Sequence, residues 1–286
     1  MKKLVMSMMA LSLVFTGCGD DDDGDVNVDF TGESKVYQLG ERDIDGVSGT
    51  ATFRELEDGT TEVTLDLDGD LEDGEDYAAH IHAGSAFPGM GAIVVTFTPV
   101  DGTTGESVTI VSELFGDDDD DDNDETITYD QLLNYNGYIN VHKFDDLSVL
   151  AAQGDIGSNE LTGNFKVYEL DEKDEPGISG TATFEERAGG SSLVTLNIQN
   201  TIDGATHPAH IHAGNANPGG GAIIFSFEPV DGTTGISRTN LSALNDDTDL
   251  SYSDVFDLDA YINVHLGPGD DLSTIVAQGN IGSNED

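Results

Sequence analysis

An internal repeat constrains the fold of this chain more than any other feature. Three stretches of the first half, residues 79–84, 48–53 and 138–142, return letter for letter at residues 209–214, 179–184 and 261–265. Self-similarity that extends over roughly 120 residues indicates two copies of one domain, since solenoids repeat at shorter periods. We therefore expect two homologous domains, at residues 34–160 and 164–286.

Each copy must be stabilised by its own apolar core. Cys18 is the only cysteine of the chain, so an internal disulfide is excluded. A domain of about 120 residues is long enough to bury such a core.

Both copies have the sequence pattern that is typical of β-strands. Short runs such as Thr61–Leu67 alternate apolar and polar residues, and Gly, Asp, Asn and Pro separate one run from the next. The more continuously apolar segment Ala92–Phe97 predicts a strand that is buried on both faces. Tyr129–Asn134 is the one helical signal, of a turn or two. We predict an all-β chain with two tandem Greek-key, immunoglobulin-like β-sandwich domains.

The N-terminus reads as a secretory signal at residues 1–17, with Lys2 and Lys3 before a mostly apolar stretch. This stretch is too short to span a membrane. Residues 15–18, Phe-Thr-Gly-Cys, resemble a bacterial lipobox, which would make Cys18 the lipidated first residue of the mature protein. An ordinary cleaved signal with a chance cysteine is the alternative.

Residues 18–33 form an acidic segment that we interpret as a tether. Its run Gly19 to Asp25 resembles the acidic export signal of surface-exposed lipoproteins of the Bacteroidota. The expected location is therefore the outer membrane or cell surface, and the membrane is a partner through the lipid on Cys18.

The formal net charge of −47 excludes nucleic acid as a partner. The densest acidic run, Asp117–Asp122, suggests calcium, but no segment has the ligand spacing of an EF-hand loop. A solvated loop is the better interpretation. No nucleophile-elbow, P-loop or dinucleotide-binding motif is present, so nothing in the sequence requires an enzyme.

Six of the seven histidines occupy equivalent positions in the two copies. Successive side chains of a strand point to opposite faces, so the two histidines of each His-Ile-His run share one face. In Tyr138-Ile-Asn-Val-His142 the same alternation of side chains places His142 on the face that points away from the core. If these two strands are neighbours, three imidazoles converge in each domain. The two trios are His80, His82 and His142, and His210, His212 and His265.

Two interpretations of the trios stay open at this point. Three neutral imidazoles suit copper or zinc and leave a coordination position free. Alternatively, the histidines hydrogen-bond loop carbonyls and stabilise the loops without a metal. The seventh histidine, His207, has no counterpart in the first copy, and we expect it at the surface or as an additional ligand.

The histidine motifs resemble those of the CHRD domain, named after chordin. Ala-His-Ile-His-Ala-Gly, a Pro/Gly-rich turn, an apolar strand and Tyr-Ile-Asn-Val-His follow in this order in both copies. The resemblance implies a β-sandwich in an extracellular context, with no established reaction. The last strand of each copy lacks the arginine that is usual in that family, so a role carried by it is in doubt.

His-Ile-His followed by Gly is also similar to the copper-ligand strand of Cu/Zn superoxide dismutases, although the bridging histidine and the cysteine pair are missing. From these observations we expect a non-enzymatic cell-surface lipoprotein with two CHRD-like modules that bind or adhere to an extracellular protein or glycan. The alternative is a copper or zinc metalloprotein of the superoxide dismutase kind.

Overall fold

The computed structural model describes residues 28–115 and 125–285. The predicted signal peptide, Cys18, most of the tether and the run Asp117–Asp122 lie outside these residues. Within the described part of the chain, no helix combines the length and the apolar character needed to cross a membrane.

The first domain is an eight-stranded antiparallel sheet with the order β6-β5-β11-β12-β1-β2-β3-β8. Two short pairs, β4 with β7 and β9 with β10, lie outside it, and one helical turn, α1, precedes β11. The bounds are β1 Phe30–Glu41, β2 Ser48–Leu56, β3 Thr61–Asp68, β4 Asp76–Tyr77, β5 Ala79–Ala83, β6 Ile93–Thr96, β7 Val100–Asp101, β8 Glu106–Val111, β9 Glu113–Leu114, β10 Glu125–Thr126, α1 Tyr129–Leu132, β11 Asn136–Lys143 and β12 Asp146–Gly157.

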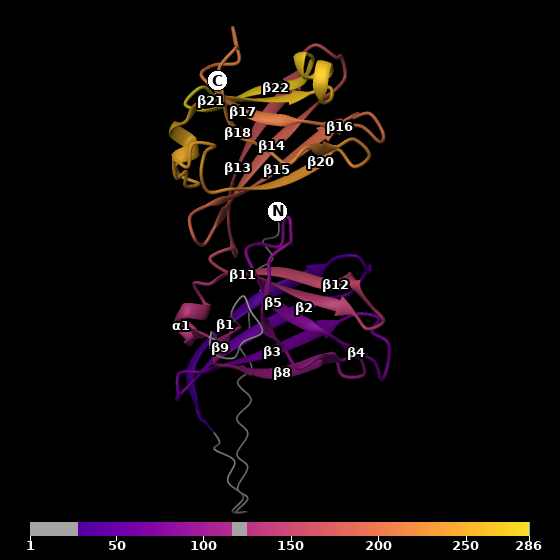
Figure 1. The fold of residues 1–286 in the computed structure, drawn as a ribbon, viewed down its shortest axis with the longest axis vertical. Coiled ribbons are helices and arrows are strands. Elements are labelled where there is room, and N and C mark those ends of the chain that lie inside the picture. Colours follow the sequence, from indigo (N-terminus) through magenta and orange to yellow (C-terminus); the bar gives the residue numbers. More distant parts are fainter. Residues whose placement is uncertain (1–27, 116–124, 286) are drawn as a thin grey trace, which may run out of the picture.

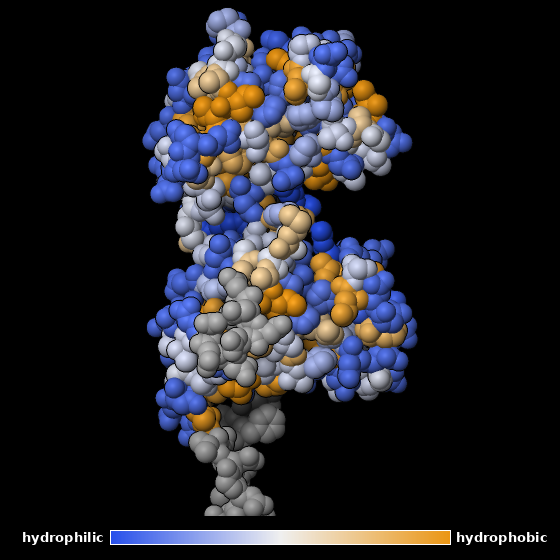
Figure 2. Space-filling model, viewed as in Figure 1, coloured by the Kyte–Doolittle hydropathy of each residue, from blue (hydrophilic) through white to orange (hydrophobic). Residues whose placement is uncertain are grey.

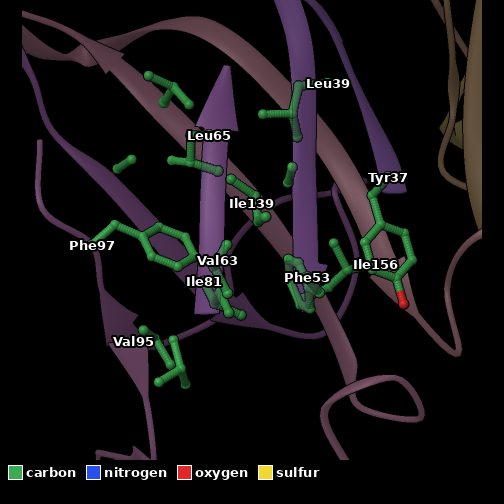
Figure 3. Packing of buried hydrophobic residues seen from close by; sticks show 14 of the residues in the cluster. Tyr37, Leu39, Phe53, Val63, Leu65, Ile81, Val95, Phe97, Ile139 and Ile156 are labelled. Carbon is green, nitrogen blue, oxygen red and sulfur yellow. The ribbon is translucent and has the colours of Figure 1, made fainter. Parts of the chain in front are cut away.

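Strand β1 folds this sheet into two layers. Most of β1 pairs with β2, whereas its last two residues, Gly40 and Glu41, pair with β12. The layer β1-β2-β3-β8 therefore faces the layer β6-β5-β11-β12 across one core. Phe53 and Val63 from the first layer meet Ile81 and Ile139 from the second, as Figure 3 shows, and all four side chains are fully buried.

The second domain repeats this topology, with the strand order β18-β17-β21-β22-β13-β14-β15-β20. It has its own core, which includes Phe184, Val194, Ile211 and Ile262. The bounds are β13 Leu161–Glu172, β14 Ser179–Arg187, β15 Ser192–Gln199, β16 Thr206–His207, β17 Ala209–Ala213, β18 Ile223–Ser226, β19 Val230–Asp231, β20 Ile236–Leu241, η2 Asp254–Asp257, β21 Asp259–His265, η3 Gly269–Ser273 and β22 Ile275–Gly282.

The predicted fold class, two tandem Greek-key, immunoglobulin-like β-sandwich domains, is confirmed. In each domain the chain crosses from one layer to the other after its third strand and returns through β8 or β20, which pairs with that third strand. The two domains are stacked along the long axis of the molecule (Figure 1). Strands β1 and β13 begin at Phe30 and Leu161, a few residues before the predicted starts of the domains.

Two local predictions have different outcomes. The helical turn at Tyr129 is confirmed, because Thr128 and Gln131 form a capping box around α1. The prediction that Ala92–Phe97 is buried on both faces is wrong. Strand β6 is the edge of its sheet, and Ile93 remains 43% exposed while Val94 and Val95 are buried. An edge strand has a neighbour on one side only, so part of its surface stays open.

The visible surface is mostly hydrophilic, with separate apolar patches over both domains (Figure 2). Among the exposed apolar side chains are Val108 and Ile110 on β8.

Candidate metal site

Strand pairing brings three histidines together in the first domain. Strands β5 and β11 are antiparallel neighbours, with His80 opposite Asn140 and His82 opposite Tyr138. The ring centroids of His80 and His142 lie 5.3 Å apart, and those of His80 and His82 lie 5.9 Å apart. One ring nitrogen from each of the three histidines lies within 4.8 Å of the others. The predicted convergence of three imidazoles is therefore confirmed.

The second domain repeats this arrangement with His210, His212 and His265. The ring centroids of His210 and His265 lie 5.1 Å apart, and one nitrogen from each of the three rings again lies within 4.8 Å of the others. Both trios lie on the side of their layer that faces away from the core, since the intervening Ile81 and Ile211 are fully buried in the two cores.

Loop carbonyls determine which nitrogen of His82 and His142 faces the cluster. His82 Nδ1 donates to the carbonyl of Gly91 at 2.9 Å, and His142 Nδ1 donates to the carbonyl of Leu147 at 2.7 Å. A carbonyl oxygen only accepts hydrogen bonds, so the proton of each neutral ring is on Nδ1. The Nε2 atom then carries the free lone pair, in the tautomer that a metal ligand needs.

Several buried ring nitrogens of the trios lack protein partners. Among the described residues, His80 Nδ1 and His82 Nε2 are buried without a hydrogen bond, as are His210 Nδ1 and His212 Nε2 of the second domain. Burying a polar atom without a partner costs free energy. Loop hydrogen bonding alone, the simpler of the two interpretations, therefore accounts for the Nδ1 atoms of His82 and His212. It leaves their Nε2 atoms and the Nδ1 atoms of His80 and His210 unexplained.

Burial lowers the pKa of four of the six histidines, His80, His142, His210 and His265, and so favours their neutral form. Desolvation, assisted by the neighbouring imidazoles, lowers the pKa of His80 and of His210 from 6.5 to about 4. Desolvation also lowers the pKa of His142 and of His265, although backbone carbonyls partly oppose the effect. Neutral imidazoles keep their lone pairs, so the rings are available for coordination without losing a proton first.

A tyrosine and a glycine support each trio. The Tyr138 ring stacks on His82 with centroids 5.0 Å apart, and its hydroxyl accepts a hydrogen bond from the Gly91 amide at 3.1 Å. Gly91 has to be glycine, because a Cβ there would collide with the carbonyl of Ala83. This close approach is what brings the Gly91 carbonyl within reach of His82.

The same support exists in the second domain. Tyr261 stacks on His212 at 5.1 Å and accepts from the amide of Gly221, whose carbonyl accepts from His212 Nδ1. The Gly-rich turns are evident in the sequence, whereas these supporting contacts appear only in the structure. The shared signal was a tyrosine four residues before the third histidine and a glycine nine residues after the second in both copies.

The prediction for His207 is wrong. This residue is fully buried, and its Nδ1 donates to the carbonyl of His265 at 3.1 Å. It is not among the residues whose ligand atoms converge in the second domain. It stands where the first domain has the buried Tyr77, so it belongs to the packing of the domain.

Comparisons with protein-family models, curated proteins and solved structures found no match for the chain. The resemblances to CHRD domains and to superoxide dismutases therefore rest on the sequence motifs themselves.

Proposed function

We propose that each domain binds one copper or zinc ion through its histidine trio. The observation that carries the proposal is the convergence, in both domains, of three imidazoles that each place one ring nitrogen within 4.8 Å of the others. His80 Nδ1, His82 Nε2 and His142 Nε2 would hold the metal in the first domain. His210 Nδ1, His212 Nε2 and one nitrogen of His265 would do so in the second.

The donor set favours borderline transition metals. Imidazole nitrogen suits Zn, Cu and Ni, whereas Ca and Mg prefer oxygen ligands. For the same nitrogen ligands Cu²⁺ binds more tightly than Zn²⁺. His80 and His142 are partly accessible to solvent, so a fourth ligand such as water can reach a metal bound there.

The charge of the protein favours binding of a cation over turnover of an anion. A net charge of −47 attracts metal ions and repels a small anion such as superoxide. We therefore propose metal binding as the function. The superoxide dismutase alternative predicts that the copper-loaded protein accelerates loss of superoxide, which a direct assay tests.

We further propose that these modules belong to the CHRD type and that a lipid on Cys18 anchors them at the cell surface, as the motifs indicate. Adhesion to an extracellular protein or glycan stays a prediction.

Titration calorimetry with Cu²⁺ and Zn²⁺ on protein purified without a histidine tag tests the proposal. We expect about two equivalents per chain, one for each trio. The double variant His82→Ala, His212→Ala should lose tight binding at both sites. The control His207→Tyr removes a histidine outside the trios, since Tyr77 fills this position in the first domain, and should retain both equivalents.

The same titrations separate the two interpretations of the trios. If the histidines serve only to stabilise loops, the double variant loses stability with little change in metal affinity. A wild-type dissociation constant weaker than about 0.1 mM for both metals, well short of a dedicated site, would refute the proposal.

A further inference from the structure

A buried arginine of the second domain forms an ion pair with the first. Arg187, at the end of β14, is only 1% exposed. Its guanidinium donates to Asp155 Oδ2 of β12 at 2.8 Å, to Asn240 Oδ1 of β20 at 2.9 Å and to the carbonyl of Asn159. Because Asp155 belongs to the first domain, this charge-assisted contact joins the two domains.

The same contact reaches the loop between β5 and β6. The second carboxylate oxygen of Asp155, Oδ1, accepts from the amide of Ala86 at 2.8 Å. Asn240 of the second domain donates to Ser85 Oγ and to the carbonyl of Phe87. Residues 85–87 are thus held by side chains that are themselves fixed by the second domain.

Phe87 strengthens the attachment. Its ring lies 4.9 Å from the guanidinium of Arg42 in the first domain and 4.9 Å from that of Arg238 in the second. Cation–π contacts with both arginines make this ring a further link across the domain boundary.

The far end of this loop orients His82. Gly91, four residues after Phe87, accepts from His82 Nδ1 and donates to Tyr138. Residues 85–91 are therefore fixed at one end by the second domain and hold a metal-facing histidine at the other.

The second domain lacks this attachment. Its equivalent loop also bonds its neighbouring strand, from the Ala216 amide to Asn280 Oδ1 at 2.9 Å, but Asn280 carries no charge to pair with an arginine. In the first domain Leu56 stands at the position of Arg187, since both residues pair with the start of the preceding strand. Among the described residues, side chains of the second domain therefore hold the loop of the first site, and no equivalent contact from the first domain holds the loop of the second.

We infer that the second domain positions the loop that orients His82, so that the two metal sites are unequal and the interface strengthens metal binding at the first. Arg187 and Asp155 are positioning residues, and the inference rests on the proposed function. Loss of a partner that orients a metal ligand typically lowers metal affinity 10- to 100-fold. Because Asp155 acts through the loop, we expect an effect of about tenfold.

The test exchanges residues between equivalent positions in the full-length protein. The interface variant is the double substitution Arg187→Leu, Asp155→Asn. Each new residue is the one found at the equivalent position of the other domain, Leu56 and Asn280. The variant removes the ion pair without leaving a buried charge unpaired, and the asparagine can keep the bond to Ala86, as Asn280 does with Ala216. Two backgrounds isolate the sites: His212→Ala leaves the first site, and His82→Ala leaves the second.

Cu²⁺ titration and the electron paramagnetic resonance spectrum of bound Cu²⁺ are measured in all four proteins. The interface variant should weaken binding at the first site about tenfold and broaden its spectrum. Binding at the second site should change by less than about twofold. That site lies in the same domain as Arg187, so its retained binding shows that the second domain is folded.

A second variant guards against an indirect effect of the charge exchange. Asn240→Ala removes the bonds to Ser85 and Phe87 without changing any charge, and it should also weaken the first site selectively. If the first site binds Cu²⁺ with the same affinity whether or not the protein carries Arg187→Leu and Asp155→Asn, the inference is overturned. The proposed function would still stand. If neither site binds Cu²⁺ tightly in the proteins that keep Arg187 and Asp155, the proposed function is refuted, and the inference with it.

Discussion

Acid should destabilise the metal-free protein through His80 and His210. In the folded chain burial lowers the pKa of each from 6.5 to about 4, whereas the unfolded chain has the ordinary histidine pKa. Between these two values the unfolded state binds more protons than the folded state, so stability falls as pH falls. The contribution is complete above about pH 6.5 and is lost progressively toward about pH 4.

The magnitude follows from the difference between the two pKa values. A histidine pKa lowered from 6.5 to about 4 corresponds to roughly 3 kcal/mol of unfolding free energy. Both rings are partly accessible to solvent, which screens the effect. We therefore expect about 1 to 2 kcal/mol for each domain.

A competing effect has the opposite sign. The chain has 57 acidic residues and a formal net charge of −47, and protonating carboxylates relieves their mutual repulsion, which stabilises the folded state as pH falls. The measurement must therefore compare the wild type with the variants His80→Gln and His210→Gln, which keep the acidic residues but remove one buried imidazole each.

Urea unfolding with a chelator, at about 0.15 M salt, gives the unfolding free energy of each protein. As pH falls from about 7.5 to about 4.5, the unfolding free energy of the wild type should decrease by about 1 to 2 kcal/mol more than that of each variant. A difference that stays constant over this range would show that burial does not hold these imidazoles neutral.

Three further predictions concern other parts of the chain. Mass spectrometry of the native N-terminus should find a lipid on Cys18, and an unmodified Cys18 or cleavage elsewhere would refute this. Residues 30–160 and 161–286, expressed separately, should each unfold cooperatively and without sensitivity to reductant, because each has its own core; a half without a transition would mean that the copies fold only together. Gly91→Ala should lower metal affinity at the first site by about tenfold or more and spare the second, because its Cβ would collide with the carbonyl of Ala83; equal affinities in a site-resolved titration would contradict this.

Local pattern in the sequence was sufficient for the fold class and for the strand face on which each candidate ligand lies. The period of two along a strand determines that His80 and His82 share a face and that Ile81 enters the core, because side-chain direction in a strand depends only on local backbone geometry. The repeat then extended this conclusion to the second domain. The same reasoning placed His142 on the face of β11 that points away from the core.

Only the tertiary structure decided what these strands lie against. The pairing of β5 with β11 joins residues about 60 positions apart, and the edge position of β6 follows from the strand order. His207 shows the same limit, because its environment is set by β19 and by the carbonyl of His265. Strand pairing depends on the packing of whole layers, which no local period encodes.

Arg187 is the clearest case of a residue whose environment only the tertiary structure decided. In the sequence it is an ordinary charged residue near the end of a strand, at a position where the first copy has Leu56. A lone arginine is expected at the surface. Stacking of the two domains buries it, and Asp155 and Asn240 compensate the cost of removing its charge from water. That compensation requires groups from both domains, so it exists only after the domains have folded and met.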